Sequence, residues 1–238
     1  GDVVAAVGVD SKQTYVAGYK TKGFTPMHLS VMDGGLDMVE YIYYMSLNYG
    51  GMEVFLADTT GKVNLLSGSQ PQLDGLKLSE NGKKAAYLDT DANTGDTILV
   101  EIELGKEKAE TVATNVQSFG YIGNTLIYYF DYTEGVGTLG AAGSKTTIAN
   151  ASGVQFTEDA VYYVADADAA TGNGELRAWD GKTETAIAKD VFAFQYKENG
   201  KLVYIGKYDV NAGVGDLYYY DGKEARKLDT GITAIFIY

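Results

Sequence analysis

One sequence pattern occurs twice in the chain, 41 residues apart. One copy begins at Gly174 and reads GELRAWDGKTETAIAKDV, and the other begins at Gly215 and reads GDLYYYDGKEARKLDTGI. Looser copies begin at Met52, Thr97 and Gly137. Each copy has two short β-rich segments around a turn that contains glycine, which is typical of a β-hairpin. Self-similarity at a period of about 40 residues predicts a fold built from equivalent units.

A second predicted hairpin precedes each copy. The segments FAFQYKENGKLVYIGKYD, from Phe192, and LKLSENGKKAAYLDTD, from Leu76, share the turn sequence Glu-Asn-Gly-Lys. Asn-Gly favours a tight hairpin because both central residues of its turn need positive φ. Each unit therefore has four strands, A to D. In the fifth unit we expect strands at 192–197, 201–208, 216–221 and 224–229.

Four strands per unit at this spacing predict an all-β fold, a β-propeller with about six blades in one domain over residues 1–238. Five blades begin near residues 27, 76, 119, 154 and 192, and residues 1–25 with 232–238 form the closing blade. The 20 tyrosines and 30 glycines suit half-buried strands and tight turns. A five-bladed ring with extra strands and an open array are the alternatives.

The repeat resembles that of bacterial six-bladed propellers of the Tol-associated type and of receptor propellers with Tyr-Trp-Thr-Asp repeats. The resemblance is architectural and covers nearly the whole chain. Trp179-Asp180 ends a C strand, as Trp-Asp does in the WD-repeat family, but its Gly-His partner is missing. No Tyr-Trp-Thr-Asp sequence is present. Propellers include lyases, hydrolases and scaffolds, so the resemblance implies no single activity.

The loops between strands B and C are rich in acids. They read DTDANTGD from Asp89, DYTEGVG from Asp131, DADAATGNG from Asp166 and YDVNAGVG from Tyr208. In the first loop the spacing of Asp89, Asp91 and Asn93, with Asp96 beyond, resembles a calcium loop. Its glycine stands at position seven instead of six, and no glutamate stands at twelve. Asp and Gly are also what a tight turn uses, so ordinary turn chemistry is the alternative.

In a four-stranded blade the B–C and D–A connections emerge on the same side. The loop acids should therefore share one face with Asp74, Asn115, Asp190 and Asp229. Carboxylates beside exposed tyrosines favour binding of a sugar or a basic peptide. The candidate ligand-binding residues are Asp131, Tyr132, Asp166, Asp168, Tyr208 and Asp209.

Composition excludes several functions. A net charge of −13 repels phosphates, so nucleic acids and anionic membranes are poor partners. The chain has no cysteine and one histidine, His28, which leaves no thiolate or histidine zinc site. GVGTLG, from Gly135, has the spacing of a dinucleotide fingerprint, but a turn and a strand are expected after it instead of the required helix. No run approaches the roughly 18 apolar residues of a membrane-spanning helix.

Three functions fit these observations. The first is a non-catalytic propeller that binds a protein or a glycan through its acidic face. The second is a structural domain of a larger protein. The third is a hydrolase or lyase that uses carboxylates, but the A strands carry almost no acids and no catalytic residue is assigned. We expect a monomer, without membrane insertion, at the cell surface or in the periplasm. Any targeting segment would lie outside this sequence.

Overall fold

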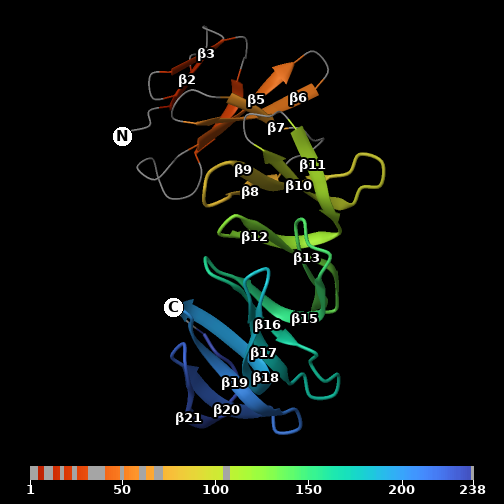
Figure 1. The fold of residues 1–238 in the computed structure, drawn as a ribbon, viewed down its shortest axis with the longest axis vertical. Helices are drawn as coiled ribbons and strands as arrows, with labels where there is room; N and C mark the ends of the chain where they lie inside the picture. Colours follow the sequence, from red (N-terminus) through yellow and green to blue (C-terminus); the bar gives the residue numbers. More distant parts are fainter. Residues whose placement is uncertain are drawn as a thin grey trace. The chain divides into compact units, whose positions relative to one another are not determined.

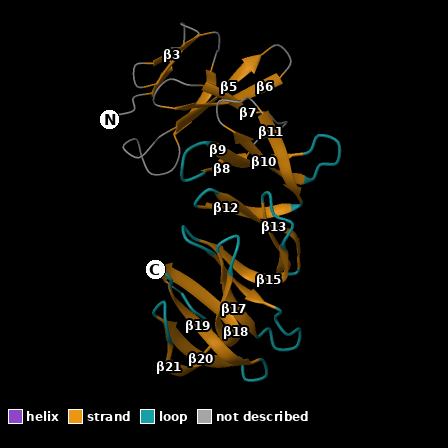
Figure 2. Cartoon of the chain, viewed as in Figure 1, coloured by secondary structure: helices purple, strands orange, loops and turns teal. Residues whose placement is uncertain are grey.

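The structure is a computed structural model with strands and no helix among the residues that it describes (Figure 2). It describes residues 5–7, 13–16, 19–22, 26–31, 41–48, 51–58, 63–66, 72–103 and 108–236. Side chains are described for residues 76–103 and 109–236. The predicted all-β class is confirmed. The chain divides into two compact units, residues 1–78 with 82–113 and residues 79–81 with 114–238.

The first unit holds three antiparallel sheets. The first sheet contains β1 (Ala5–Val7), β2 (Gln13–Val16) and β3 (Tyr19–Lys22). The second sheet contains β4 (Pro26–Val31), β5 (Tyr41–Asn48), β6 (Gly51–Asp58) and β7 (Val63–Leu66). The third sheet contains β8 (Gln72–Leu78), β9 (Lys84–Thr90), β10 (Thr97–Glu103) and β11 (Lys108–Thr114). The two four-stranded sheets are the first two predicted repeats, and each pairs its strands in sequence order.

The second unit is one antiparallel sheet of ten strands in sequence order (Figure 1). Its first five strands are β12 (Val116–Ile122), β13 (Thr125–Thr133), β14 (Val136–Ala141), β15 (Thr147–Phe156) and β16 (Val161–Ala165). Its last five are β17 (Gly174–Trp179), β18 (Glu184–Glu198), β19 (Lys201–Asp209), β20 (Val214–Tyr220) and β21 (Ala225–Ile232). These strands make up the third, fourth and fifth predicted repeats.

Two long strands join these three repeats. The first half of β15 pairs with β14 as strand D of the third repeat, and its second half pairs with β16 as strand A of the fourth. In the same way β18 pairs first with β17 and then with β19. A residue with positive φ stands at each change of partner, Asn150 at 56° and Asp190 at 56°. Asn and Asp tolerate this left-handed conformation better than most residues, which explains their place here.

The glycine that opens each strong copy of the pattern is required by a close backbone approach. A Cβ at Gly174 would overlap the carbonyl oxygen of Ala165, and a Cβ at Gly215 would lie 2.9 Å from that of Gly206. The residues that follow those carbonyls, Asp166 and Lys207, have positive φ. Gly137 and Asp131 repeat the arrangement in the third repeat. The second repeat has Thr97 at this position, opposite Thr90, which has no positive φ.

The repeated Asp-Gly-Lys sequence forms the turn between strands C and D. The Asp180 carboxylate accepts the N–H groups of Lys182 and Thr183 at 2.8 and 2.7 Å. The Asp221 carboxylate accepts those of Lys223 and Glu224 at 2.9 and 3.0 Å. The glycine that follows the aspartate, Gly181 or Gly222, has positive φ in both turns. The duplicated sequence is therefore duplicated turn chemistry.

Buried side chains form two layers around the fourth repeat. The layer shared with the third repeat includes Ile127, Tyr163 and Trp179, and the layer shared with the fifth repeat includes Leu176 and Tyr204. Strand β16 is buried on both faces, and its successive residues point alternately into the two layers. This is the packing expected of stacked repeats, each of which covers the apolar face of its neighbour.

Closure of a ring by the two ends of the chain is not confirmed. The first 25 residues were expected to contribute part of a shared blade, but β1, β2 and β3 form a three-stranded sheet of their own. In the tail, residues 233–236 belong to no strand, and Phe236 is 76% exposed. Residues 237 and 238 lie outside the described part of the chain. The number of blades and the single-domain organisation therefore stay predictions.

Candidate functional site

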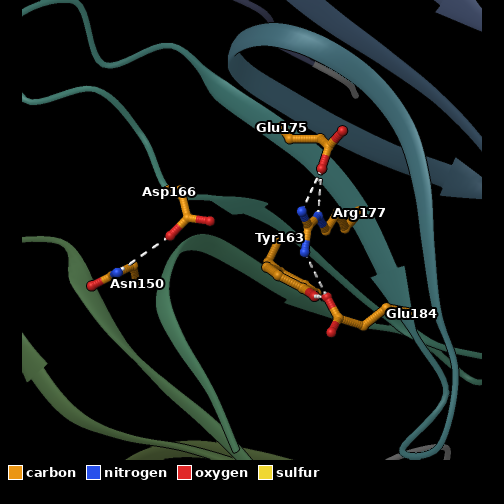
Figure 3. A network of polar contacts seen from close by, with 6 residues as sticks. All are labelled: Asn150, Tyr163, Asp166, Glu175, Arg177 and Glu184. Carbon is orange, nitrogen blue, oxygen red and sulfur yellow. Dashed lines mark hydrogen bonds and ion pairs between the residues drawn. The ribbon is translucent and has the colours of Figure 1, made fainter.

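The B–C and D–A ends of a repeat meet in the second unit. The side-chain amide of Asn115 donates a hydrogen bond to the Asp131 carboxylate at 3.3 Å, and that of Asn150 donates to Asp166 at 3.2 Å (Figure 3). In both pairs the aspartate N–H also donates to the asparagine carbonyl, at 3.1 Å. All four residues are exposed and have positive φ. Each pair therefore holds a carboxylate at the end of strand B and leaves it in contact with solvent.

The next two acids of this face order their own loops. The Asp168 carboxylate accepts the N–H and hydroxyl groups of Thr171 and the N–H of Ala170, and these bonds lower the pKa of Asp168 below its usual value. The Asp209 carboxylate accepts the N–H groups of Asn211 and Ala212. In both loops the carbonyl of the aspartate accepts the N–H of a glycine four residues later. We use the name acidic face for the exposed residues Asp131, Tyr132, Asp166, Asp168 and Asp209 together with half-buried Tyr208.

The loop proposed to bind calcium has the same turn chemistry. The Asp91 carboxylate accepts the N–H groups of Asn93 and Thr94 at 2.8 and 3.1 Å, which lowers the pKa of Asp91. The N–H of Asp91 donates to the carbonyl of Asp96. Asp89 lies in strand β9, is 1% exposed and accepts the N–H of Thr90. Among the residues that the structure describes, no group of three or more His, Cys, Asp or Glu could hold a metal ion.

Calcium binding by Asp89, Asp91, Asn93 and Asp96 stays a prediction with a direct test. If calcium binds only the folded loop, a hundredfold excess over the dissociation constant should raise the melting temperature by about 5–10 °C relative to chelator. Asp91→Asn should abolish the difference, whereas Asp209→Asn in the similar fifth-repeat loop should not. Differential scanning fluorimetry measures both. Identical melts at millimolar calcium would contradict the site.

Aromatic side chains accompany the acids. Tyr132 is 48% exposed and meets Tyr129 edge to face, with ring centroids 5.8 Å apart. Tyr208 stacks on Phe192, with centroids 3.9 Å apart and ring planes 8° from parallel. Phe192 is 37% exposed. The acidic face thus combines charged groups with flat apolar surface, and both are accessible to a partner.

The loops of the fourth and fifth repeats are joined by one asparagine. The Asn173 side-chain amide donates to the carbonyl of Tyr208 at 2.9 Å, and its oxygen accepts the Tyr208 N–H at 3.1 Å. Gln155 makes the same paired contact with the carbonyl of Phe194 and the N–H of Tyr196, both at 3.0 Å. Two side-chain amides therefore act as short bridges between neighbouring repeats and fix their spacing.

Away from the loops, one arginine joins strands β17 and β18 (Figure 3). Arg177 Nε donates to Glu175 at 2.7 Å, and its Nη1 donates to Glu184 at 3.0 Å. The hydroxyl of buried Tyr163 donates to Glu184 at 2.6 Å. The hydrogen bonds to Glu175 and Glu184 raise the pKa of Arg177. The pKa of Tyr163 is raised mainly by burial and, to a smaller extent, by its hydrogen bond to Glu184. Because two carboxylates already surround Arg177, the cluster ties strands together and offers no cationic site.

The dinucleotide-like motif does not have the structure that nucleotide binding requires. GVGTLG falls mostly in strand β14, and the residues after it form a turn and then strand β15. The helix that a dinucleotide fingerprint requires is therefore replaced by a strand. His28 lies in strand β4, and its side chain is outside the described part of the structure, as is that of Asp74 in β8. Among the described residues no helix could span a membrane.

No protein-family model matches this chain, and no curated protein matches it in sequence. Solved structures do match it in architecture. The β-propeller domain of the trilobed protease from Pyrococcus furiosus is 14% identical, with a TM-score of 0.49, over 84% of this chain and 71% of that one. TolB from Acinetobacter baumannii is 10% identical, with a TM-score of 0.41, over 96% of this chain and 64% of that one.

An acylaminoacyl peptidase also matches, at 12% identity and a TM-score of 0.47 over 77% of this chain. The chain spans only 37% of the length of that peptidase. The neighbours thus include propeller domains, in agreement with the architectural resemblance expected from the repeat. They include peptidases as well as TolB, so they do not distinguish binding from catalysis.

The sequence did not indicate Phe192 or Asn173 as site residues. Phe192 was counted only as part of an apolar A strand, and Asn173 as part of a polar loop. A comparison of equivalent positions shows only that the third repeat has Gln117 and Val136 at these places. The contacts of both residues cross from one repeat to the next, and no pattern within a repeat predicts them.

Proposed function

We propose that this chain is a non-catalytic binding module whose acidic face takes a protein partner with a cationic surface. The observation that carries the proposal is the gathering of exposed carboxylates and aromatic rings at one end of consecutive repeats. Asp131 and Asp166 are held there by asparagine partners, and Tyr132, which follows Asp131, is 48% exposed. Acidic surfaces steer cationic partners to themselves, and exposed aromatic rings supply the apolar contact.

The fold does not require a negative charge at these positions. The position of Asp166 and Asp131 is taken by Lys207 in the fifth repeat, which has the same left-handed backbone. A negative charge is therefore not what this backbone position requires. Asp168 and Asp209 do serve their loops, but an asparagine side chain would accept the same N–H bonds.

A charge-neutralised variant tests the proposal. Asp131→Asn, Asp166→Asn and Asp209→Asn together remove three charges, and asparagine keeps both the left-handed backbone and the turn acceptor. We expect this variant to bind a fluorescein-labelled nona-arginine peptide about fivefold or more weakly in fluorescence anisotropy. The wild-type affinity should also fall as salt is raised from about 50 to 300 mM, because salt screens exposed charges.

The matched control removes three charges at the other end of the strands. Glu158, Asp159 and Glu198 are exposed in the turns between strands A and B of the fourth and fifth repeats. Their neutralisation to glutamine or asparagine changes net charge by the same amount, and it should leave peptide affinity within about twofold. Equal weakening by both triple variants, or an affinity that ignores salt, would overturn the proposal.

A glycan is the second candidate ligand, favoured by the flat stacked rings of Phe192 and Tyr208. Location outside the cytoplasm, a monomeric state and a six-bladed ring closed by both termini belong to the same proposal. They rest on the resemblance to Tol-associated propellers and on the stacked repeats.

A further inference from the structure

We infer that the stacked pair Phe192 and Tyr208 is the anchor of the acidic face, where the pair binds an arginine or lysine side chain of the protein partner, and that Asn173 positions it. This inference rests on the proposed function and names the contact at its centre. The rings are 3.9 Å apart and nearly parallel, and Phe192 stays 37% exposed. An exposed stacked pair presents π surface that a guanidinium or ammonium group can contact.

A β-bulge gives Phe192 its orientation. The register between β18 and β19 shifts between Val191 and Ala193, so Phe192 has no direct partner across the strand pair. The same bulge occurs in the third repeat between Val116 and Ser118, and there the bulged residue is Gln117. Bulges re-aim side chains and are common beside functional sites.

The fold does not require an aromatic pair at these positions. Counted from the left-handed residues, the equivalents of Phe192 and Tyr208 are Gln117 and Tyr132 in the third repeat. In the fourth repeat they are Ser152 and Ala167. The third repeat thus builds the same bulge with a different pair, whereas in the fourth repeat Ser152 pairs directly with Val164. Of these three repeats only the fifth stacks two rings. The stacked pair is therefore not dictated by the backbone, and its exposed ring surface is available for contact with a partner.

The loop of the fourth repeat holds the pair in place. The two hydrogen bonds of Asn173 fix the backbone of Tyr208, and the backbone of Gly172 approaches Phe192 so closely that a Cβ there would lie 3.0 Å from the ring. Valine takes the position of Asn173 in the third and fifth repeats, as Val136 and Val214. The loop itself therefore does not require the asparagine, and the role of its two hydrogen bonds is to hold the backbone of Tyr208.

Charge decides the kind of ligand. Four exposed carboxylates belong to the loops and strand ends around the pair, those of Asp166, Asp168, Asp190 and Asp209. The exposed cations in the same segments are Lys189 and Lys207. Acids outnumber bases beside exposed rings, which favours a cationic side chain over a neutral or anionic group.

Two variants without any change of net charge test the anchor. Phe192→Gln copies Gln117 of the third repeat, and Asn173→Val copies Val136 and Val214. We expect Phe192→Gln to weaken nona-arginine binding about fivefold or more, and Asn173→Val to weaken it about threefold. In the double variant Asn173→Val should add nothing, because it acts through the stack. Leu228→Gln, which removes another half-exposed apolar side chain on β21, is the control.

The outcomes separate this inference from the proposed function. If the wild type binds the peptide in a salt-dependent way and Phe192→Gln binds equally well, the anchor is wrong and the binding face stands. If the wild type does not bind the peptide, the proposed function itself fails. If maltohexaose binds and its binding depends on Phe192 while the peptide does not bind, the partner is a glycan and the cationic ligand is overturned. An additive effect of Asn173→Val in the double variant would show that Asn173 does not act through the pair.

Discussion

Replacing Trp179 by alanine should lower the free energy of unfolding by about 3–5 kcal/mol. Trp179 is 2% exposed and lies in the buried layer that joins the third and fourth repeats. Its removal would leave a cavity beside Ile127 and Tyr163, whose strands cannot close over it without breaking their pairing. A globular protein has about 5–15 kcal/mol of stability in total, so this is a large share.

Urea unfolding followed by far-UV circular dichroism measures the loss. Fluorescence would mislead, because Trp179 is the only tryptophan. Tyr220, 41 residues later, is the matched control, since it holds the same place in the fifth repeat and is only half-buried. Tyr220→Ala should cost roughly 1–2 kcal/mol. Equal losses for the two variants would show that the layer between the third and fourth repeats is not the closed core described.

The repeat could be predicted from sequence because its signals are local. The turn from Asp180 to Thr183 is specified by a carboxylate that accepts the N–H groups two and three residues later, and Asp221 repeats this four-residue unit. Asn199-Gly200 likewise marks a tight hairpin, and both residues have positive φ. The fourth and fifth repeats share the Asp turn, so identical residues at a spacing of 41 indicate the same backbone conformation.

The loops show why the nature of a site is harder to predict than its place. Asp91 and Asn93 stand at calcium-loop spacing, and the structure uses the Asp91 carboxylate to close a turn onto the Asn93 N–H. Asp168 and Asp209 do the same in loops without that spacing. One residue pattern therefore serves two chemistries, and only geometry with a cation present separates them.

Contacts between repeats could not be predicted from sequence. The bonds of Asn173 to Tyr208 span 35 residues, and the bond of Gln155 to Phe194 spans 39. Nothing within the loop DADAATGNG distinguishes Asn173 as a bridge, since valine fills its place elsewhere. The stacking of Phe192 on Tyr208 likewise depends on a bulge, which is a property of two paired strands and not of either segment alone.

Replacing Gly174 by alanine should destabilise the fold by about 1–3 kcal/mol or more, although one methyl group is all that is added. The new Cβ would overlap the carbonyl oxygen of Ala165 and lie 2.6 Å from Cγ1 of Val164. The carbonyl cannot retreat easily, because Asp166 follows it in the left-handed conformation and is bonded to Asn150. Gly215→Ala should behave alike, since its Cβ would lie 2.5 Å from Cγ2 of Ile205.

The second repeat supplies the control. Thr97 holds the position of Gly174 there, and its partner Thr90 has no positive φ, so that backbone already accommodates a Cβ. Thr97→Ala should therefore change the unfolding free energy by less than about 1 kcal/mol. In thermal melts the melting temperature of Gly174→Ala should fall by about 2–4 °C for each kcal/mol of lost stability. Binding of nona-arginine should also weaken, because the distorted carbonyl adjoins the acidic face. If Gly174→Ala and Thr97→Ala have the same melting temperature, the close approach of strands B and C is not what requires glycine. The repeated Gly-acid-Leu pattern then needs another explanation.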